Sequence, residues 1–351
     1  MKNTILLFLT ACSVICAPLP AMCGEPHLRN VRQLTFGGDN AEAYWSPDGS
    51  RLTFQSNFAG WGHACDQIHM LNFAQVMDDS SYRPPLISTG KGRTTCSYFM
   101  PNGREILYAS THDAGEECPP EPAPRADKKY LWQVLPTYDI YVANERGDIT
   151  KRLTNRRGYD AEATVSPRGD KIVFTSDRSG DLELWIMNID GSNPVQVTDE
   201  LGYDGGAFFS PDGTKLVYRA SRPKTPEAQR EYKELLAQGL VAPTDMEIFV
   251  CNVDGTDVQQ ITHLGKANWA PYFHPSQKKI LFSSNHASAR GYDFQLYMIG
   301  LDGKGLEQIT TESIFNAFPM FSPDGKFLVW SSNRLNNGTR DTNVFVAEWV
   351  D

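Results

Sequence analysis

The sequence lacks a long apolar run beyond its first 23 residues, where no stretch comes near the roughly 18 apolar residues that a membrane-spanning helix needs. It also lacks an excess of positive charge, because 33 Lys and Arg residues stand against 42 Asp and Glu residues and the net charge is −9. A broad nucleic-acid interface depends on such an excess, and so does attraction to an anionic membrane. We therefore expect no transmembrane helix, no nucleic-acid partner and no binding to an anionic membrane surface.

What the sequence does contain favours an all-β fold. Hydrophobic residues make up 40% of the chain, which is enough for a large core and excludes a disordered protein. With 28 glycines and 22 prolines the chain is rich in turn residues, and 14 Tyr, 18 Phe and 7 Trp suit strands. Many short strands joined by turns are the expected result.

The first 23 residues predict a signal peptide rather than a part of the fold. Lys2 provides a positive charge, residues 5–15 form a short apolar stretch, and Ala21 and Cys23 belong to a small-residue cleavage site. We expect export to the periplasm or out of the cell. Residues 9–12 also resemble the sequence before the lipidated cysteine of bacterial lipoproteins, so lipidation at Cys12 stays an alternative.

A repeated tight turn organises the remainder of the chain. Proline at the second position fixes φ, and Asp or Asn followed by Gly supplies the rest of the turn geometry. Because apolar runs flank each copy, every copy is expected to join the two strands of a hairpin. The first, fourth and last copies read Ser-Pro-Asp-Gly, and the six copies stand at residues 46–49, 100–103, 166–169, 210–213, 274–277 and 322–325.

Two further strands follow each hairpin. The third strand combines a polar, an aliphatic and usually an aromatic residue, as in Glu183, Leu184 and Trp185. The fourth ends in an aliphatic residue followed by Ser or Thr, and the sixth such ending, Leu34 with Thr35, precedes the first hairpin. Four-stranded repeats whose last copy takes its outer strand from the N-terminus predict a closed six-bladed β-propeller, here over residues 31–351.

Two insertions enlarge this repeat, near residues 111–137 and 221–245. Both leave a second strand and return to a third, so both should lie on the same face of the propeller. The later insertion has Thr225 as a helix cap and Pro226 at the first helical position, which predicts one short inserted helix packed on the propeller. This helix either covers a blade edge or binds a partner, and the sequence leaves both open.

The repeat resembles the PD40, or WD40-like, repeat of TolB-type propellers. The resemblance rests on the Ser-Pro-Asp-Gly turn, on Ser176, Asp177 and Arg178 at the end of a second strand, on the aliphatic-aromatic third strand and on the closing Leu-Thr pair. It implies a six-bladed propeller in the cell envelope that binds or scaffolds a protein or a glycan. We expect such a protein to be a monomer.

Oligogalacturonate lyases also resemble this chain in their propeller repeat, which implies an alternative function as a polysaccharide lyase or hydrolase. These lyases hold a metal with several histidines. The chain has 7 histidines, and no three of them converge when the repeats are aligned. His112 and His286, for example, fall in opposite blades. A binding function is therefore favoured over catalysis, no catalytic residue is assigned, and the presence of a metal stays unknown.

Alignment on the turn proline places polar and aromatic residues at the starts of the six inner strands. Because these strands start at one end of the channel, the residues should ring one mouth and bind a ligand there. Oxygens of Asp160, Glu162, Asp204 and the Asn side chains could hold a hard cation such as calcium. The rings of Tyr159, Tyr203 and Phe315 could stack on a sugar or peptide. Asx turns are the structural alternative. The predicted mouth residues are Asn40, Glu42, Arg93, Tyr159, Asp160, Glu162, Tyr203, Asp204, Asn268, Phe315 and Asn316.

Export also changes the expected chemistry of the cysteines beyond residue 23, because oxidising compartments favour disulfides. Cys251 lies in an apolar strand and is expected to be a buried hydrophobe. Cys65 and Cys118 lie in loops on one face of adjacent blades and form the favoured disulfide. Cys96 begins an inner strand at the same face, so a Cys65–Cys96 pair competes. A zinc site built from these three cysteines and a histidine is a third option.

Overall fold

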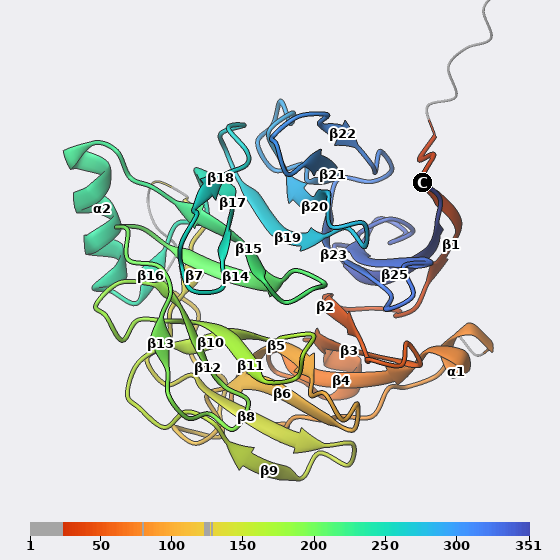
Figure 1. Ribbon diagram of the computed structural model, residues 1–351. Coiled ribbons are helices and arrows are strands. Elements are labelled where there is room, and N and C mark those ends of the chain that lie inside the picture. The colour runs from red at the N-terminus through yellow and green to blue at the C-terminus, as the bar shows by residue number, and fades with distance from the viewer. Residues whose placement is uncertain (1–23, 79–80, 123–126, 128) are drawn as a thin grey trace, which may run out of the picture.

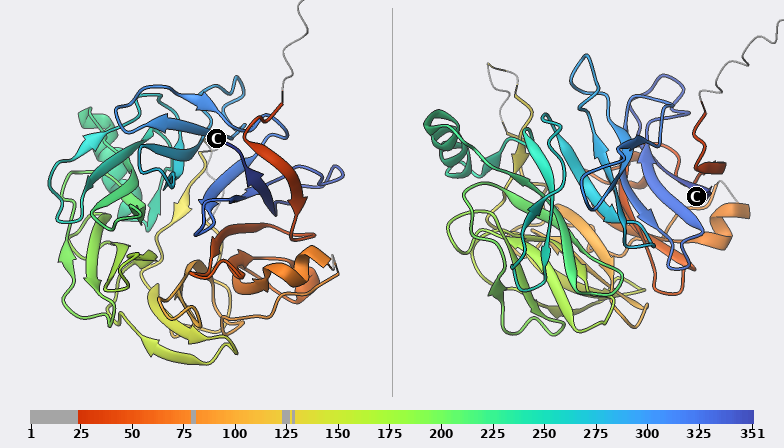
Figure 2. Two further views of the ribbon diagram at one scale, coloured as in Figure 1. Left: turned by 45° about the vertical axis from the view of Figure 1, so that its right-hand side comes forward. Right: turned by 45° about the horizontal axis from the view of Figure 1, so that its top comes forward.

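The computed structural model describes residues 24–78, 81–122, 127 and 129–351. Six sheets of three or four strands are arranged around a central channel like the blades of a propeller (Figure 1, Figure 2). The predicted all-β, six-bladed propeller is confirmed. The signal peptide predicted for residues 1–23 and the lipidation alternative at Cys12 lie outside the described residues.

The innermost strand of every blade is six residues long. Each pairs antiparallel with the second strand of its blade, and each pairing shifts register after the second residue. The third residue of every inner strand has a positive φ, so each inner strand carries a β-bulge at the same place. The inner strands are β2 (Asn40–Trp45), β5 (Thr94–Phe99), β10 (Asp160–Val165), β14 (Asp204–Phe209), β19 (Asn268–Phe273) and β23 (Asn316–Phe321).

The repeated turns join each inner strand to a second strand. In the first turn Ser46 Oγ donates to Asp48 Oδ1 at 2.6 Å, and Gly49 has a φ of 69°, which glycine adopts without strain. Apolar side chains of the second and third strands pack between neighbouring blades. The second strands are β3 (Arg51–Ser56), β6 (Glu105–Ser110), β11 (Lys171–Ser176), β15 (Lys215–Ser221), β20 (Lys279–Ser284) and β24 (Phe327–Ser332). The third strands are β4 (Gln67–Asn72), β8 (Asp139–Asn144), β12 (Glu183–Asn188), β17 (Met246–Asn252), β21 (Gln295–Gly300) and β25 (Asn343–Trp349).

The outer edges of the blades are less regular. In the last blade β1, the first strand of the described residues, pairs antiparallel with β25. In the first blade the expected fourth strand near Ile87 is reduced to a bridge between His69 and Leu86. Pro84 and Pro85 precede Leu86 and have no N–H groups with which to continue the ladder. The outer strands are β1 (Leu28–Gln33), β9 (Ile149–Arg152), β13 (Val195–Gln196), β18 (Gln259–Gln260) and β22 (Glu307–Gln308).

The two insertions meet each other outside the blades. Strand β7 of the first insertion pairs antiparallel with β16 of the second, with Trp132 opposite Val241. The second insertion contains the predicted helix, and the Thr225 hydroxyl caps it by accepting a hydrogen bond from the Ala228 N–H at 3.2 Å. Two further short helices follow strands of the first blade, and the repeat pattern does not predict them. The elements are β7 (Trp132–Gln133), α2 (Pro226–Leu236), β16 (Leu240–Val241), η1 (Ala59–Trp61) and α1 (Phe73–Asp78).

Helix α2 has 11 residues, and no helix in the described part of the chain is long and apolar enough to cross a membrane.

Candidate functional site

The six bulged residues of the inner strands meet inside the channel. They line a small cavity of about 30 Å³, which has room for about one water molecule. A left-handed backbone is strained for residues other than glycine, and such strain concentrates at functional positions. One bulged residue from every blade borders this cavity. The residues, with φ from 47° to 59°, are Glu42, Cys96, Glu162, Gly206, Ala270 and Phe318.

A buried ion pair lies beside this cavity. Glu162 pairs with Arg219 from β15, and its Oε2 accepts hydrogen bonds from Thr175 Oγ1 at 2.7 Å and from the Gly206 N–H at 2.9 Å. The Tyr203 hydroxyl lies 2.6 Å from the same oxygen and 2.7 Å from Arg219 Nη2. Several hydrogen bonds thus support both charges, and removal of either partner would leave the other charge buried and unpaired.

Glu42 borders the same cavity with fewer partners. Its Oε2 is buried and has no hydrogen-bond partner among the described residues. Burial raises the pKa of Glu42 to about 7, although a hydrogen bond from Cys96 acts in the opposite direction. Burial also raises the pKa of the Cys96 thiol well above its usual range. The channel therefore holds one carboxyl group that changes charge near neutral pH, beside a thiol that stays protonated.

The polar residues that start the inner strands are held inside the blades. Asp160 is fully buried and accepts hydrogen bonds from Ser176 Oγ at 2.6 Å and from Arg178 Nη2 at 2.8 Å. Asp204 is also fully buried, and its carboxylate pairs with Arg222. Both carboxylates therefore connect the start of an inner strand to residues at or just after the end of the second strand of the same blade.

The predicted calcium ligands do not meet at one point. Each of the three carboxylates is paired with a different arginine. Glu162 pairs with Arg219, whereas Asp160 and Asp204 pair with Arg178 and Arg222 of their own blades. Among the described residues, no group of three or more His, Cys, Asp or Glu side chains could hold a metal ion. The amide side chains at equivalent strand starts are likewise fully buried and donate to backbone carbonyls; these are Asn40, Asn268 and Asn316.

The insertions cover the mouth at which the inner strands start. The ring centroid of Trp132 in β7 lies 4.9 Å from the guanidinium carbon of Arg219 and 5.1 Å from the ring of Trp269. Trp269 in turn donates from Nε1 to the Pro243 carbonyl of the second insertion at 2.9 Å. We call the paired strands β7 and β16 the roof. The mouth predicted to bind a ligand is thus packed against the roof on this side of the channel.

The other predicted mouth residues take different positions. Tyr159 and Tyr203 are buried in the apolar cluster that packs against Trp132 of the roof. Arg93 donates from Nη1 to Gln133 of the roof at 2.6 Å. Phe315 is half-buried, with its ring 6.0 Å from that of Phe294. The sequence thus locates residues near one mouth, but it does not show that the insertions occupy the space between them.

The opposite mouth of the channel is open. Between the six hairpin turns lies a cavity of about 470 Å³, which we call the funnel. Phe208 borders both the funnel and the small inner cavity, and its ring lies 5.2 Å from that of Tyr272 and 6.3 Å from that of Tyr98. Sequence reasoning missed this site, although the repeated turn prolines mark it. Exposed prolines form its rim: Pro47, Pro101, Pro167, Pro211, Pro275 and Pro323.

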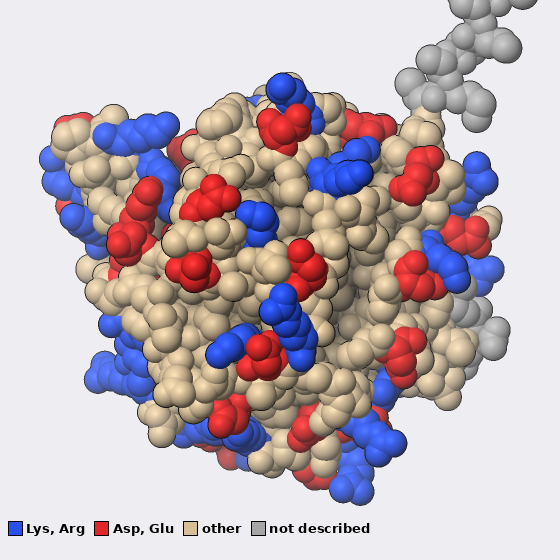
Figure 3. Space-filling model, viewed as in Figure 1, with Lys and Arg blue, Asp and Glu red and all other residues tan. Residues whose placement is uncertain are grey.

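The funnel carries little charge. Arg168 is the one charged residue among the described residues that line it. The hydroxyls of Ser46 and Ser210 already donate to the aspartates of their own turns, at 2.6 Å and 2.7 Å. Elsewhere, acidic and basic side chains are interspersed over the face seen in Figure 3. The funnel therefore suits an apolar ligand group better than a charged one.

The structure joins Cys65 to Cys118 in a disulfide with a Cα–Cα distance of 6.0 Å. Cys96 is free in the channel wall and Cys251 is free and buried, so neither the Cys65–Cys96 pair nor a three-cysteine zinc site is formed in the described structure. Of the histidines, His63 and one buried neighbour, His69, come together, with 2.7 Å between their Nε2 atoms.

Comparison with known proteins agrees with the fold. Residues 132–225 match the family described as the TolB beta propeller domain, PD40. Among solved structures, the chain is similar to a protein described as TolB from Agrobacterium tumefaciens, with a TM-score of 0.56 and 20% identity over 90% of this chain and 91% of that one. The resemblance to TolB-type propellers predicted from the repeat is confirmed.

Two further structures are similar to this chain. TolB from Acinetobacter baumannii has a TM-score of 0.53 and 16% identity, and the match covers 89% of this chain but 63% of that protein. An oligogalacturonate lyase in complex with manganese has a TM-score of 0.51 and 12% identity, over 92% of this chain and 93% of the lyase. At these identities the similarity shows the fold and leaves the function to be argued from the site.

Proposed function

We propose that this TolB-like propeller is an exported, non-catalytic binding protein that takes an apolar segment of a partner protein into the funnel. The observation that carries the proposal is the open cavity of about 470 Å³, with aromatic walls and a proline rim. Apolar cavities of roughly 300–1,000 Å³ with few polar groups are typical binding sites. A glycan would need free hydrogen-bonding groups, whereas the rim hydroxyls of Ser46 and Ser210 are engaged in their own turns.

Export is supported by the disulfide between Cys65 and Cys118, because such bonds persist in oxidising compartments. The positive charge, apolar stretch and small-residue site of residues 1–23 support the same proposal. The partner would then be a protein of the cell envelope, which the propeller would bind as a monomer.

The test places negative charge on the rim of the funnel. Pro101 and Pro211 are exposed, so the double variant Pro101→Glu, Pro211→Glu adds charge without filling the core. Val195→Glu in β13 is the matched control, because Val195 is 63% exposed on an outer strand. Wild type and both variants are immobilised and incubated with a cell-envelope extract, after thermal melts have shown that all three are folded.

A protein retained by wild type and by Val195→Glu but lost by the double variant supports binding in the funnel. Equal retention by all three proteins would place the binding surface elsewhere. If no protein is retained by any of them, the binding proposal fails.

The fold similarity to an oligogalacturonate lyase favours one second candidate, a lyase or hydrolase acting on a polysaccharide. The residues do not fit a resident metal, since no suitable group of three ligands exists in the described chain and the ring nitrogens of His63 and His69 face each other. We therefore derive no catalytic step. Incubation of the wild type with oligogalacturonate and manganese, followed by absorbance of newly formed double bonds, tests this candidate directly, and turnover would overturn the proposal of a non-catalytic protein.

A further inference from the structure

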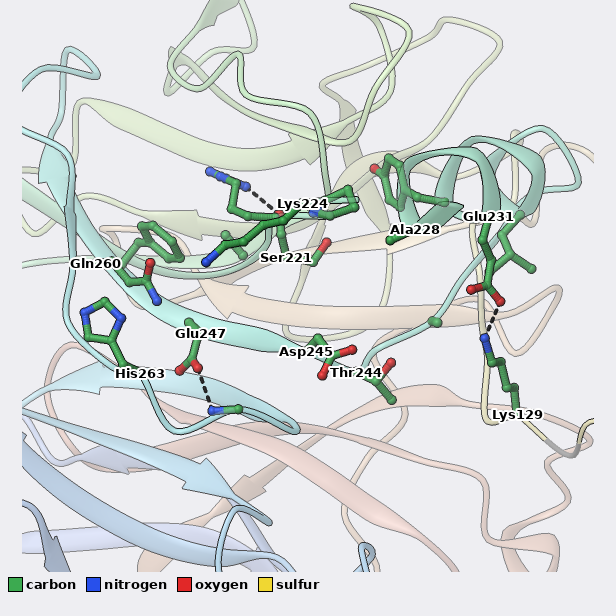
Figure 4. Close-up of a pocket in the computed structure, with 18 residues that line it drawn as sticks. Lys129, Ser221, Lys224, Ala228, Glu231, Thr244, Asp245, Glu247, Gln260 and His263 are labelled. Carbon is green, nitrogen blue, oxygen red and sulfur yellow. Dashed lines mark hydrogen bonds and ion pairs between the residues drawn. The ribbon is translucent and has the colours of Figure 1, made fainter. Parts of the chain in front are cut away.

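We propose that the crevice between α2 and the fourth blade is a second binding site, which holds a short peptide by its two charged ends. The crevice has a volume of about 530 Å³ and is bordered by the end of β15, by α2, by β17 and by the loop after β18 (Figure 4). None of its lining residues borders the funnel, so this inference does not rest on the proposed function.

The middle of the crevice is apolar. Leu235 of α2 is buried, and Ala220 and Pro223 line the blade side. Phe249 is only 6% exposed, and the guanidinium carbon of Arg222 lies 5.1 Å from its ring centroid. Phe249 and the buried Tyr232 are the Phe, Tyr and Trp residues among the described lining residues, so the crevice offers no open Phe, Tyr or Trp ring on which a sugar could stack.

The crevice also contains charged groups that have no partner in the described chain. Lys224, Asp245 and His263 take part in none of the hydrogen bonds or ion pairs of the described residues, and all three are exposed. Figure 4 shows Lys224, His263 and Glu247 toward one end of the crevice, Asp245 farther along it, and the ion pair of Lys129 with Glu231 at the other end. The neighbouring Arg222 is different, because Asp204 and Glu200 already engage it.

A second carboxylate, Glu247, is fixed between Asp245 and His263 (Figure 4). Glu247 accepts hydrogen bonds from the Gly265 N–H at 2.7 Å and from Thr262 Oγ1 at 2.6 Å, so its position is set by the loop around it. Asp245 has a φ of 53°, a left-handed backbone that positions it just before β17. The crevice therefore holds one fixed carboxylate, Glu247, beside His263, and one free carboxylate, Asp245, farther along it.

These features together specify the ligand class. Lys224 can bind a carboxylate and Asp245, farther along the crevice, can bind an ammonium group, while the apolar walls suit short side chains. A peptide of about three residues with free termini has both charges at its ends and fits a cavity in the range typical of ligand sites. A purely anionic ligand would leave the charge of Asp245 unpaired, and a neutral sugar would leave the charges of both Lys224 and Asp245 unpaired.

The probe is tri-alanine with free termini, and its N-acetyl and C-amide forms each lack one terminal charge. Isothermal titration calorimetry on the full chain should show binding of tri-alanine, with affinity reduced at least tenfold for each modified form. Lys224→Met should weaken binding of tri-alanine at least tenfold, and so should Asp245→Asn, in which asparagine keeps the left-handed backbone. Lys304→Met, on an exposed turn of another blade, is the matched control and should change nothing.

Three results would overturn the proposal. One is the absence of binding at 10 mM for tri-alanine, Ala-Leu-Ala and Ala-Phe-Ala alike. Another is equal affinity for the free and end-blocked peptides. The third is tighter binding of galacturonate than of any peptide, with dependence on Lys224 but not on Asp245, which would make the crevice a site for anions.

Discussion

The ring of Trp132 lies over the guanidinium group of Arg219, with 4.9 Å between the ring centroid and Cζ. Arg219 is itself 7% exposed and pairs with Glu162 beside the inner cavity. A desolvated contact between a cation and an aromatic ring is worth about 2 kcal/mol. The contact therefore links the roof, which is built by the two insertions, to the ion pair of the channel.

Replacing Trp132 by alanine should loosen the roof. We expect a loss of about 2–3 kcal/mol of unfolding free energy, because the contact with Arg219 and the packing against Trp269 both disappear. The thiol of Cys96, which borders the inner cavity, should also react faster with a maleimide reagent. Denaturant titration and labelling kinetics measure the two effects.

Tyr130→Ala is the control, because Tyr130 belongs to the same insertion but is 64% exposed. It should change neither stability nor labelling by a measurable amount. A Trp132→Ala protein with wild-type stability and labelling would show that the roof is not held by this contact.

The sequence predicts the blades well because their signals are local. The turn from Ser46 to Gly49 contains its own hydrogen bonds and its own left-handed glycine, so a few residues specify it in any context. The helix start at Thr225 and Pro226 is specified in the same way, by a cap and a fixed φ.

The candidate site is less predictable because it depends on contacts between distant residues. A left-handed backbone at the bulges brings Glu42, Cys96 and Phe318 to the channel, although residues of these types rarely adopt it. Among the six bulged residues, only Gly206 is of a type that indicates a left-handed backbone. The roof requires Trp132 to pair with Val241, which no local pattern indicates. Hence the sequence predicts one ligand site from the polar strand starts, whereas in the structure arginines and backbone groups already pair with these side chains.

Stability should fall as the pH rises through neutrality, and Glu42→Gln should reduce this fall. The pKa of Glu42 is raised from about 4.5 in the unfolded chain to about 7 in the folded protein. Between these two pKa values the folded state therefore binds more protons than the unfolded state, so low pH favours folding. The free energy of unfolding falls by up to about 3 kcal/mol by pH 8. The raised pKa values of Glu183 and Asp204 act in the same direction.

Melting temperatures between pH 5 and pH 8 test this expectation. The variant should be more stable than the wild type at pH 8 and close to it at pH 5, whereas Glu348→Gln, at an exposed position, should follow the wild type. Parallel pH profiles for the wild type and Glu42→Gln would mean that Glu42 does not carry the effect.

Reduction of the bond between Cys65 and Cys118 should destabilise the protein. The two cysteines are separated by 53 residues, and a cross-link closing a loop of this length contributes roughly 4 kcal/mol in the chain-entropy description. Dithiothreitol should therefore lower the melting temperature of the wild type and leave the Cys65→Ser, Cys118→Ser double variant unchanged. If the reductant lowers both melting temperatures equally, the effect comes from somewhere other than this bond.

Removing residues 24–36 should expose an edge of the last blade and abolish cooperative unfolding. Strand β1 pairs with β25, the Leu34 N–H donates to the Val344 carbonyl at 2.7 Å, and the Val344 N–H donates to Thr35 Oγ1 at 2.9 Å. Without these bonds β25 becomes an unpaired edge strand, which invites aggregation, and the first and last blades are no longer joined. A chain that begins at Gly24 is the control and should melt like the full protein. A chain that begins at Gly37 should melt over a broad range and aggregate; if it melts sharply at the temperature of the control, the first strand does not hold the propeller together.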